Sequence, residues 1–121
     1  MRQRHLLTFG LDDQLAQRLH ELVQDRGVAL RVTRQPEACL NLLRQGAVGA
    51  LILRVGRDLE SEYGLLAQAA RLFPRVANVV IGDLDHPQLT GLAWDLGAHC
   101  VLSAPVDPEA LRDVVLKMLD E

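Results

Sequence analysis

Acidic side chains that could bind a divalent cation occur at two places in this chain. Asp12 and Asp13 come early, and Asp83-Leu84-Asp85-His86 comes later, directly before Pro87. Carboxylate oxygens are the ligands that Mg²⁺ prefers in proteins. Neighbouring acids before a proline are, however, more typical of a turn that begins a helix, and Asp12 is a good N-cap. We therefore predict no metal site and no bound cofactor from these residues.

The other residues that could do chemistry are one cation and two thiols. Arg54 ends a strongly apolar run, where it could form an ion pair with Asp12 or Asp83 and hold the neighbouring loops, or could simply be solvated. An exposed pair stabilises a protein by only about 0–1 kcal/mol, so a locking role requires partial burial. Cys39 and Cys100 lack a CxxC spacing and are typical of reduced thiols in a cytosolic protein.

Composition excludes several function classes. The 121 residues suit a single domain, and the formal net charge is −3 without a Lys/Arg cluster, so we expect no nucleic-acid binding. No apolar run approaches the roughly 20 residues that span a bilayer, and the first residues do not resemble a secretion signal. We expect no membrane contact.

Apolar runs alternate with segments of helical periodicity along the whole chain. Strands that alternate with helices of about 10–15 residues form a parallel sheet with helices on both faces. We therefore predict an α/β three-layer sandwich. We predict five strands, at Leu6–Phe9, Val28–Val32, Ala50–Val55, Val76–Ile81 and Ala98–Leu102. We predict five helices, from Asp12 toward Gly27, from Pro36 to about Gln45, at Leu59–Leu72, at Pro87–Leu96, and from Asp107-Pro108 onward.

The segment Gly97-Ala98-His99-Cys100-Val101-Leu102-Ser103-Ala104-Pro105 resembles the last strand of a response-regulator receiver domain of the chemotaxis-regulator-like type. In that family the run reads Gly-Ala, two acidic residues, an aromatic, an apolar residue, any residue, then Lys-Pro. Here Val101 replaces the aromatic and Ala104 replaces the lysine. The resemblance implies a (βα)5 flavodoxin-like fold with strand order 2-1-3-4-5, a cis Ala104–Pro105 bond and a bacterial cytoplasmic setting.

The resemblance also places the phosphorylation site, which this chain has lost. A working receiver has two acids after strand 1, a phosphate-accepting aspartate at the end of strand 3, a hydroxyl after strand 4 and a lysine after strand 5. The residues at these positions lack that chemistry, and they are Gly10, Leu11, Arg54, Gly82 and Ala104. A register shift of one or two would make Asp12 and Asp13 the acid pair. Even then a cation that opposes Mg²⁺ replaces the acceptor.

Three functions remain open. The favoured one is a pseudo-receiver, a phosphorylation-independent interaction and regulatory module without enzyme activity, and we expect it to be part of a longer signalling protein. The second is an active two-component receiver with a displaced acidic site at Asp12, Asp13 or Asp83. The third is a flavodoxin-like cofactor-binding protein, which the absence of a Gly-rich phosphate loop after the first strand disfavours.

A docking surface is predicted on the face formed by the fourth helix, the fifth strand and the fifth helix. Exposed tryptophans are frequent anchors of protein interfaces, so Trp94 would lie near the centre of this surface. A protein partner or a second copy of the chain, giving a homodimer, would bind there. The residues expected on the surface are Trp94, Asp95, Val101, Arg112 and Leu116. The alternative is that Trp94 folds down as a lid on the core.

Overall fold

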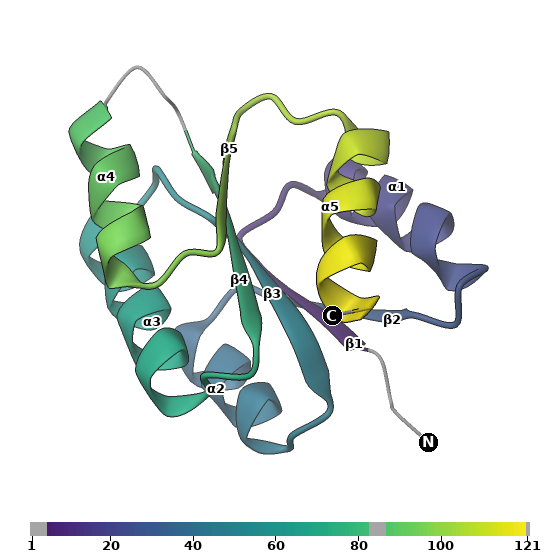
Figure 1. Ribbon diagram of the computed structural model, residues 1–121, viewed down its shortest axis with the longest axis horizontal. Helices are drawn as coiled ribbons and strands as arrows, with labels where there is room; N and C mark the ends of the chain where they lie inside the picture. The colour runs from purple at the N-terminus through teal and green to yellow at the C-terminus, as the bar shows by residue number, and fades with distance from the viewer. Residues whose placement is uncertain (1–4, 83–86, 121) are drawn as a thin grey trace.

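The computed structural model describes residues 5–82 and 87–120, in which strands and helices alternate strictly (Figure 1). The strands are β1 (His5–Phe9), β2 (Ala29–Thr33), β3 (Val48–Arg54), β4 (Ala77–Gly82) and β5 (Cys100–Ser103). The helices are α1 (Asp13–Gln24), α2 (Pro36–Arg44), α3 (Leu59–Leu72), α4 (Pro87–Leu96) and α5 (Pro108–Asp120).

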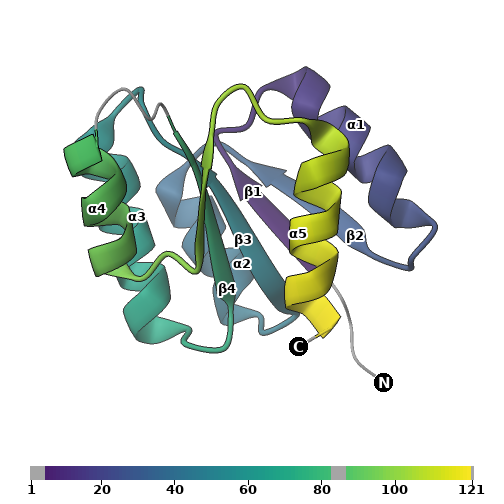
Figure 2. The same cartoon turned by 45° about the horizontal axis from the view of Figure 1, so that its top comes forward.

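The strands form one parallel sheet in the order β2-β1-β3-β4-β5. Helices α1 and α5 cover one face of it, and α2, α3 and α4 cover the other (Figures 1 and 2). This is the three-layer, flavodoxin-like arrangement that the alternation and the resemblance predict. The fold prediction is confirmed.

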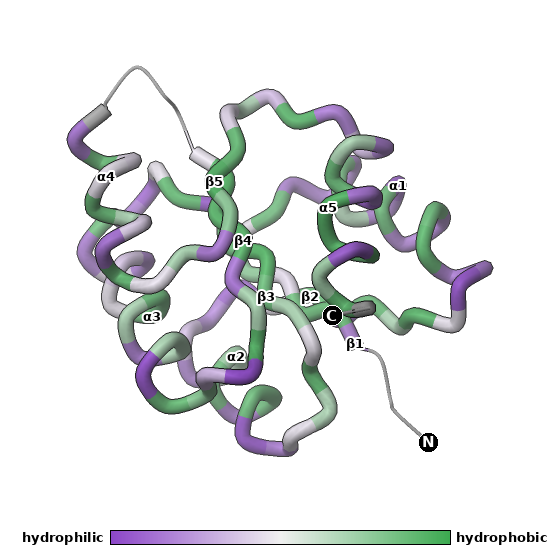
Figure 3. The backbone as a smooth tube through the Cα atoms, in the orientation of Figure 1, coloured by the Kyte–Doolittle hydropathy of each residue, from purple (hydrophilic) through white to green (hydrophobic). Residues whose placement is uncertain are grey.

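The central strands are buried on both faces, because successive side chains of a strand point to opposite sides. In β3, Leu51 and Leu53 join the core under α2, α3 and α4. Ala50 and Ile52 join the core under α1 and α5. The hydropathy colouring of Figure 3 is accordingly green along much of the sheet. Two apolar layers therefore hold the helices to one sheet.

Most predicted boundaries agree with the structure within two residues, and the helices Leu59–Leu72 and Pro87–Leu96 agree fully. Strand β5 begins at Cys100, two residues later than predicted. The amide of Ala98 donates to the carbonyl of Ala93, 3.0 Å away, so Ala98 forms part of the turn that closes the end of α4. Gly97 has a φ of +119°, which only glycine adopts freely, and it packs directly against Ala70 of α3.

Carboxylates begin two of the helices. Asp12 caps α1 by accepting a hydrogen bond from the amide of Leu15 at 2.8 Å. Asp58 caps α3 through the amide of Ser61 at 3.3 Å. Such caps satisfy amides that lack a partner within the helix. None of the helices in the described ranges is both long and apolar enough to cross a membrane.

Candidate functional site

The residues after β1, β3, β4 and β5 meet at one edge of the sheet, as expected for parallel strands. A Cβ atom built on Gly10 would lie 3.4 Å from the carbonyl oxygen of Arg54 and 3.7 Å from its Cβ. The amide of Ala104 donates to the carbonyl of Gly82 at 2.8 Å. The structure thus brings together four positions that the sequence analysis singled out. The Ala104–Pro105 bond is cis, which confirms that prediction.

No carboxylate comes from the end of β1. Gly10 has a φ of +77°, and its amide donates to the carbonyl of Thr33 at 3.2 Å. Leu11 is 1% exposed and belongs to the core under α1 and α5. A charged side chain at position 11 would require burying an ion among apolar groups, which is costly without a partner. Gly10 and Leu11 therefore supply no metal ligand, and Leu11 contributes to the hydrophobic core.

Arg54 is partly buried at the end of β3, but the ion pair with Asp12 that was considered for it is not formed. The carboxylate of Asp12 is used as the cap of α1. Arg54 takes part in no ion pair within residues 5–82 and 87–120. Asp83, the other partner considered, lies outside the described residues, as do Leu84, Asp85 and His86.

The carboxylates of Asp12 and Asp13, the alternative acidic pair, both have other partners. Asp12 caps α1, and the well-exposed carboxylate of Asp13 forms an ion pair with Arg34. In the part of the chain that the structure describes, no group of three or more His, Cys, Asp or Glu side chains could hold a metal ion. Glycine, leucine, arginine and alanine supply no carboxylate oxygen, so the residues at this edge do not fit Mg²⁺.

One buried carboxylate at this edge was missed by the sequence analysis. Glu62 of α3 is 5% exposed, and its two oxygens accept hydrogen bonds from the amides of Gly56 at 2.8 Å and Arg57 at 3.4 Å. These bonds hold the loop that follows Arg54 against α3. The only available signal was an acid in the first turn of a helix, which is too common to reveal a loop contact.

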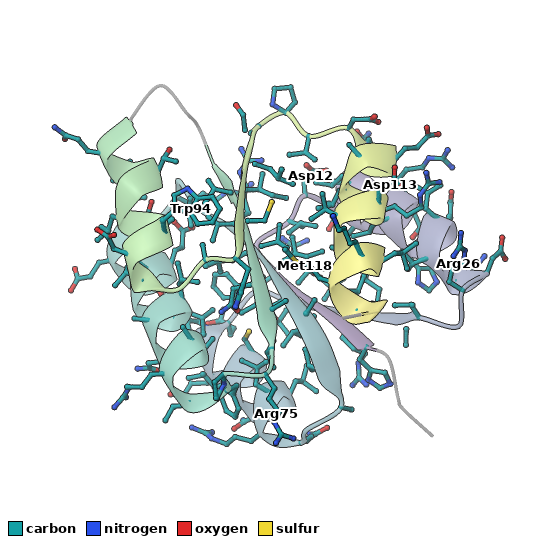
Figure 4. All side chains as sticks on the ribbon, in the orientation of Figure 1. Asp12, Arg26, Arg75, Trp94, Asp113 and Met118 are labelled. Carbon is teal, nitrogen blue, oxygen red and sulfur yellow. The ribbon has the colours of Figure 1, made fainter. Side chains whose placement is uncertain are left out.

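The predicted docking surface needs correction. Trp94 of α4 is 49% exposed, so it is no lid on the core (Figure 4). Leu116 is 8% exposed and packs in the core under α1 and α5, so its placement on the surface was wrong. Val101 packs against the core on the other face of the sheet. Because the sheet separates Val101 from Leu116, the two cannot share a patch with Trp94.

The charged residues expected to frame that surface are also placed by the structure. Asp95 lies exposed on α4, next to Trp94. Arg112 lies on α5, where its Nε atom is 2.9 Å from a carboxylate oxygen of the neighbouring Asp113. The exposed apolar residues that remain on α4 are Trp94 and Leu92. Of the apolar residues expected on the predicted surface, only Trp94 is therefore exposed, and it lies on α4.

Comparison with known proteins agrees with this architecture. No protein-family model and no curated protein matches the sequence. A CheY-like receiver domain from Methanospirillum hungatei gives a TM-score of 0.82 at 16% identity, covering 99% of this chain and 95% of that chain. An orphan response regulator of H. pylori gives 0.83 at 14%, covering 98% of this chain and 99% of that chain. A response regulator from Thermotoga maritima gives 0.81 at 15%, with 100% of both chains covered.

These similarities define the class of fold. The described residues have the CheY-like fold of response-regulator receiver domains. At identities of 14–18% the likeness concerns the arrangement of the elements. What the residues at the site can do must be argued from their own chemistry.

Proposed function

We propose that this domain is a pseudo-receiver, which regulates a signal-transduction protein through protein–protein contact, without phosphorylation and without enzyme activity of its own. The observation that carries the proposal is Arg54 at the end of β3, beside Gly10, at an edge where the described residues form no group of three or more metal ligands. The likeness to receiver domains supports a cytoplasmic signalling role.

The chemistry of phosphoryl transfer supports this proposal. Transfer to a receiver requires a carboxylate oxygen that attacks phosphorus, and a metal ion that neutralises the phosphoryl oxygens. A guanidinium has no such nucleophile, and its permanent charge opposes binding of a divalent cation. Burial of Leu11 removes a further ligand position. Each loss alone would impair transfer, and they occur together.

The alternative is an active receiver that uses Asp12 and Asp13. The hydrogen bond from Leu15 to Asp12 and the ion pair between Arg34 and Asp13 oppose this alternative, because metal binding would have to break both. The acceptor at position 54 would still be missing. We therefore favour the pseudo-receiver.

Protein–protein interaction is the function that remains for a receiver-like domain that is not phosphorylated. The large apolar side chains of Leu92 and Trp94 are exposed on α4. We propose that a protein partner, or a second copy of this chain, docks on α4 around Trp94. Because no phosphorylation would control this surface, docking should be constitutive.

The decisive experiment exposes the domain to Mg²⁺ and acetyl phosphate and measures its intact mass, with an active receiver domain as the positive control. We expect no phosphoryl adduct on the wild-type chain. We expect none on Arg54→Asp either, because Gly10 and Leu11 still supply no metal ligand. A phosphoryl adduct on the wild-type chain that Asp12→Asn or Asp13→Asn abolishes would establish the displaced site instead.

A further inference from the structure

A cavity of about 220 Å³ lies between α3, α4 and the carboxyl ends of β4 and β5. Gly82 and Val101 line it from the sheet, Tyr63 from α3, and Leu89 and Ala93 from α4. Gly82, Val101 and Ala93 have small side chains, so the sheet and α4 leave space that larger side chains would fill. The cavity is partly open, so a small molecule could enter it from solvent.

We infer that this cavity is a binding site for a small neutral aromatic molecule that carries one N–H or O–H donor, of the size of phenol or indole. The inference is independent of the proposed function, because none of its steps depends on whether the domain is phosphorylated. Size, charge and hydrogen bonding each restrict the ligand.

The size of the cavity suits one or two fused rings. An engineered apolar cavity of about 150 Å³ binds benzene, so a space of about 220 Å³ accommodates a ring with a substituent or a second ring. The ring of Tyr63 lines one side. Aromatic rings attract one another in stacked or edge-to-face arrangements, which favours an aromatic ligand over an aliphatic one.

The described part of the lining disfavours charged ligands. No residue that lines the cavity, among those described, has a charged side chain, and most are apolar. A carboxylate or an ammonium group would lose its hydration there without gaining a partner of opposite charge. The ligand is therefore expected to be neutral.

The polar groups of the lining favour a ligand with a donor. The hydroxyl of Tyr63 donates its proton to the carbonyl of Leu89 at 2.8 Å, so its oxygen remains available only as an acceptor. The hydroxyl of Thr90 also lines the cavity and can accept. Sites for small ligands typically combine apolar walls with a few such polar groups.

The test is a titration of the ¹⁵N-labelled chain with phenol and, separately, with indole, followed by amide chemical shifts. We expect saturable shifts at Gly56, Gly82, Thr90 and Val101 with at least one of the two probes. Benzoate, which has a similar ring but a negative charge, should bind at least ten-fold more weakly. The absence of saturable shifts up to the solubility limit of both probes would overturn the inference, as would benzoate binding equally well.

A variant that fills the cavity locates the site. Val101→Phe should weaken binding of the probe at least ten-fold, whereas Ser103→Phe, which adds the same ring at an exposed position of β5, should bind like the wild type. If Val101→Phe does not fold, Ala93→Val narrows the same cavity from α4 and takes its place. A folded cavity variant that binds like the wild type would show that the probe binds elsewhere and would refute the assignment.

Discussion

The Cγ2 methyl group of Val55 occupies the space into which a side chain at position 82 would extend. A Cβ atom built on Gly82 would lie only 2.8 Å from that methyl group. The neighbouring backbone is held in place, because the amide of Val55 donates to the carbonyl of Ile81 at 2.9 Å. A hydroxyl-bearing residue at position 82 therefore does not fit beside Val55, and the two positions are coupled.

Replacing Gly82 should reveal this coupling. Valine is stiff at χ1, so the methyl group cannot easily move away, and we expect Gly82→Ala to destabilise the domain by about 1–3 kcal/mol. Urea unfolding measures the loss. Residues in contact give non-additive effects, so Gly82→Ala combined with Val55→Ala should cost less than the two single changes added together. Strict additivity would contradict the proposed clash.

Trp94→Ala should weaken association without unfolding the domain. Removal of a central interface tryptophan typically costs about 2 kcal/mol or more of binding free energy. Because Trp94 is half exposed, the free energy of unfolding should change by no more than about 0.5 kcal/mol. Sedimentation equilibrium and partner binding give the first quantity, and thermal unfolding gives the second. Leu72→Ala, at a similarly exposed position on α3, is the matched control and should leave association intact.

Glu62→Ala should loosen the loop that follows Arg54. The variant removes the acceptor of the Gly56 and Arg57 amides, and bonds to a charged group contribute about 1.5–3 kcal/mol. We expect a loss of stability near the lower end of that range, since water can reach part of the loop, and faster hydrogen exchange at the Gly56 amide. Glu60→Ala, on the same helix but exposed, should change neither. Unaltered exchange at Gly56 in Glu62→Ala would mean that another group holds the loop.

Alkaline pH should destabilise the domain through Tyr63. Burial raises the pKa of Tyr63 above its usual value of 10.0, and the negative charge of Glu62 raises it further. A pKa that is higher in the folded state means that folding favours the neutral phenol. This contribution is complete below about pH 10 and is lost as the pH rises through the folded-state pKa. Tyr63 is the only tyrosine of the chain, so tyrosinate absorbance reads its pKa directly. A native midpoint at or below that of the unfolded chain would be inconsistent with this environment.

The two thiols should react at very different rates. Burial raises the pKa of Cys39 to about 11, although a hydrogen bond with Thr33 opposes the shift. Since the thiolate is the reactive form, Cys39 should resist Ellman's reagent at pH 8 until the domain unfolds, whereas the partly exposed Cys100 reacts in the native state. The variant Cys39→Ser assigns the two phases. A fast native reaction of Cys39 would imply frequent local opening of α2.

Local signals along the chain predict the helices and strands and their order. Period-2 and period-3.6 patterns, prolines and capping acids are local signals, so the helices Leu59–Leu72 and Pro87–Leu96 were predicted at their observed bounds. The resemblance at Ala104-Pro105 supplied the strand order and with it the positions at the sheet edge. The positions at the sheet edge are set by the residue at which each strand ends, and strand ends depend on the local sequence.

The surroundings of each side chain, in contrast, follow from how the elements pack together. Leu116 lies on the apolar stripe of α5, and packing of this helix against α1, β3 and β4 buried it. The contact of Val55 with Gly82 and the bonds of Glu62 to Gly56 and Arg57 join residues of different elements or loops. Such contacts depend on how far and at what angle the elements approach one another, and this geometry results from the packing of the entire core, which no local pattern encodes.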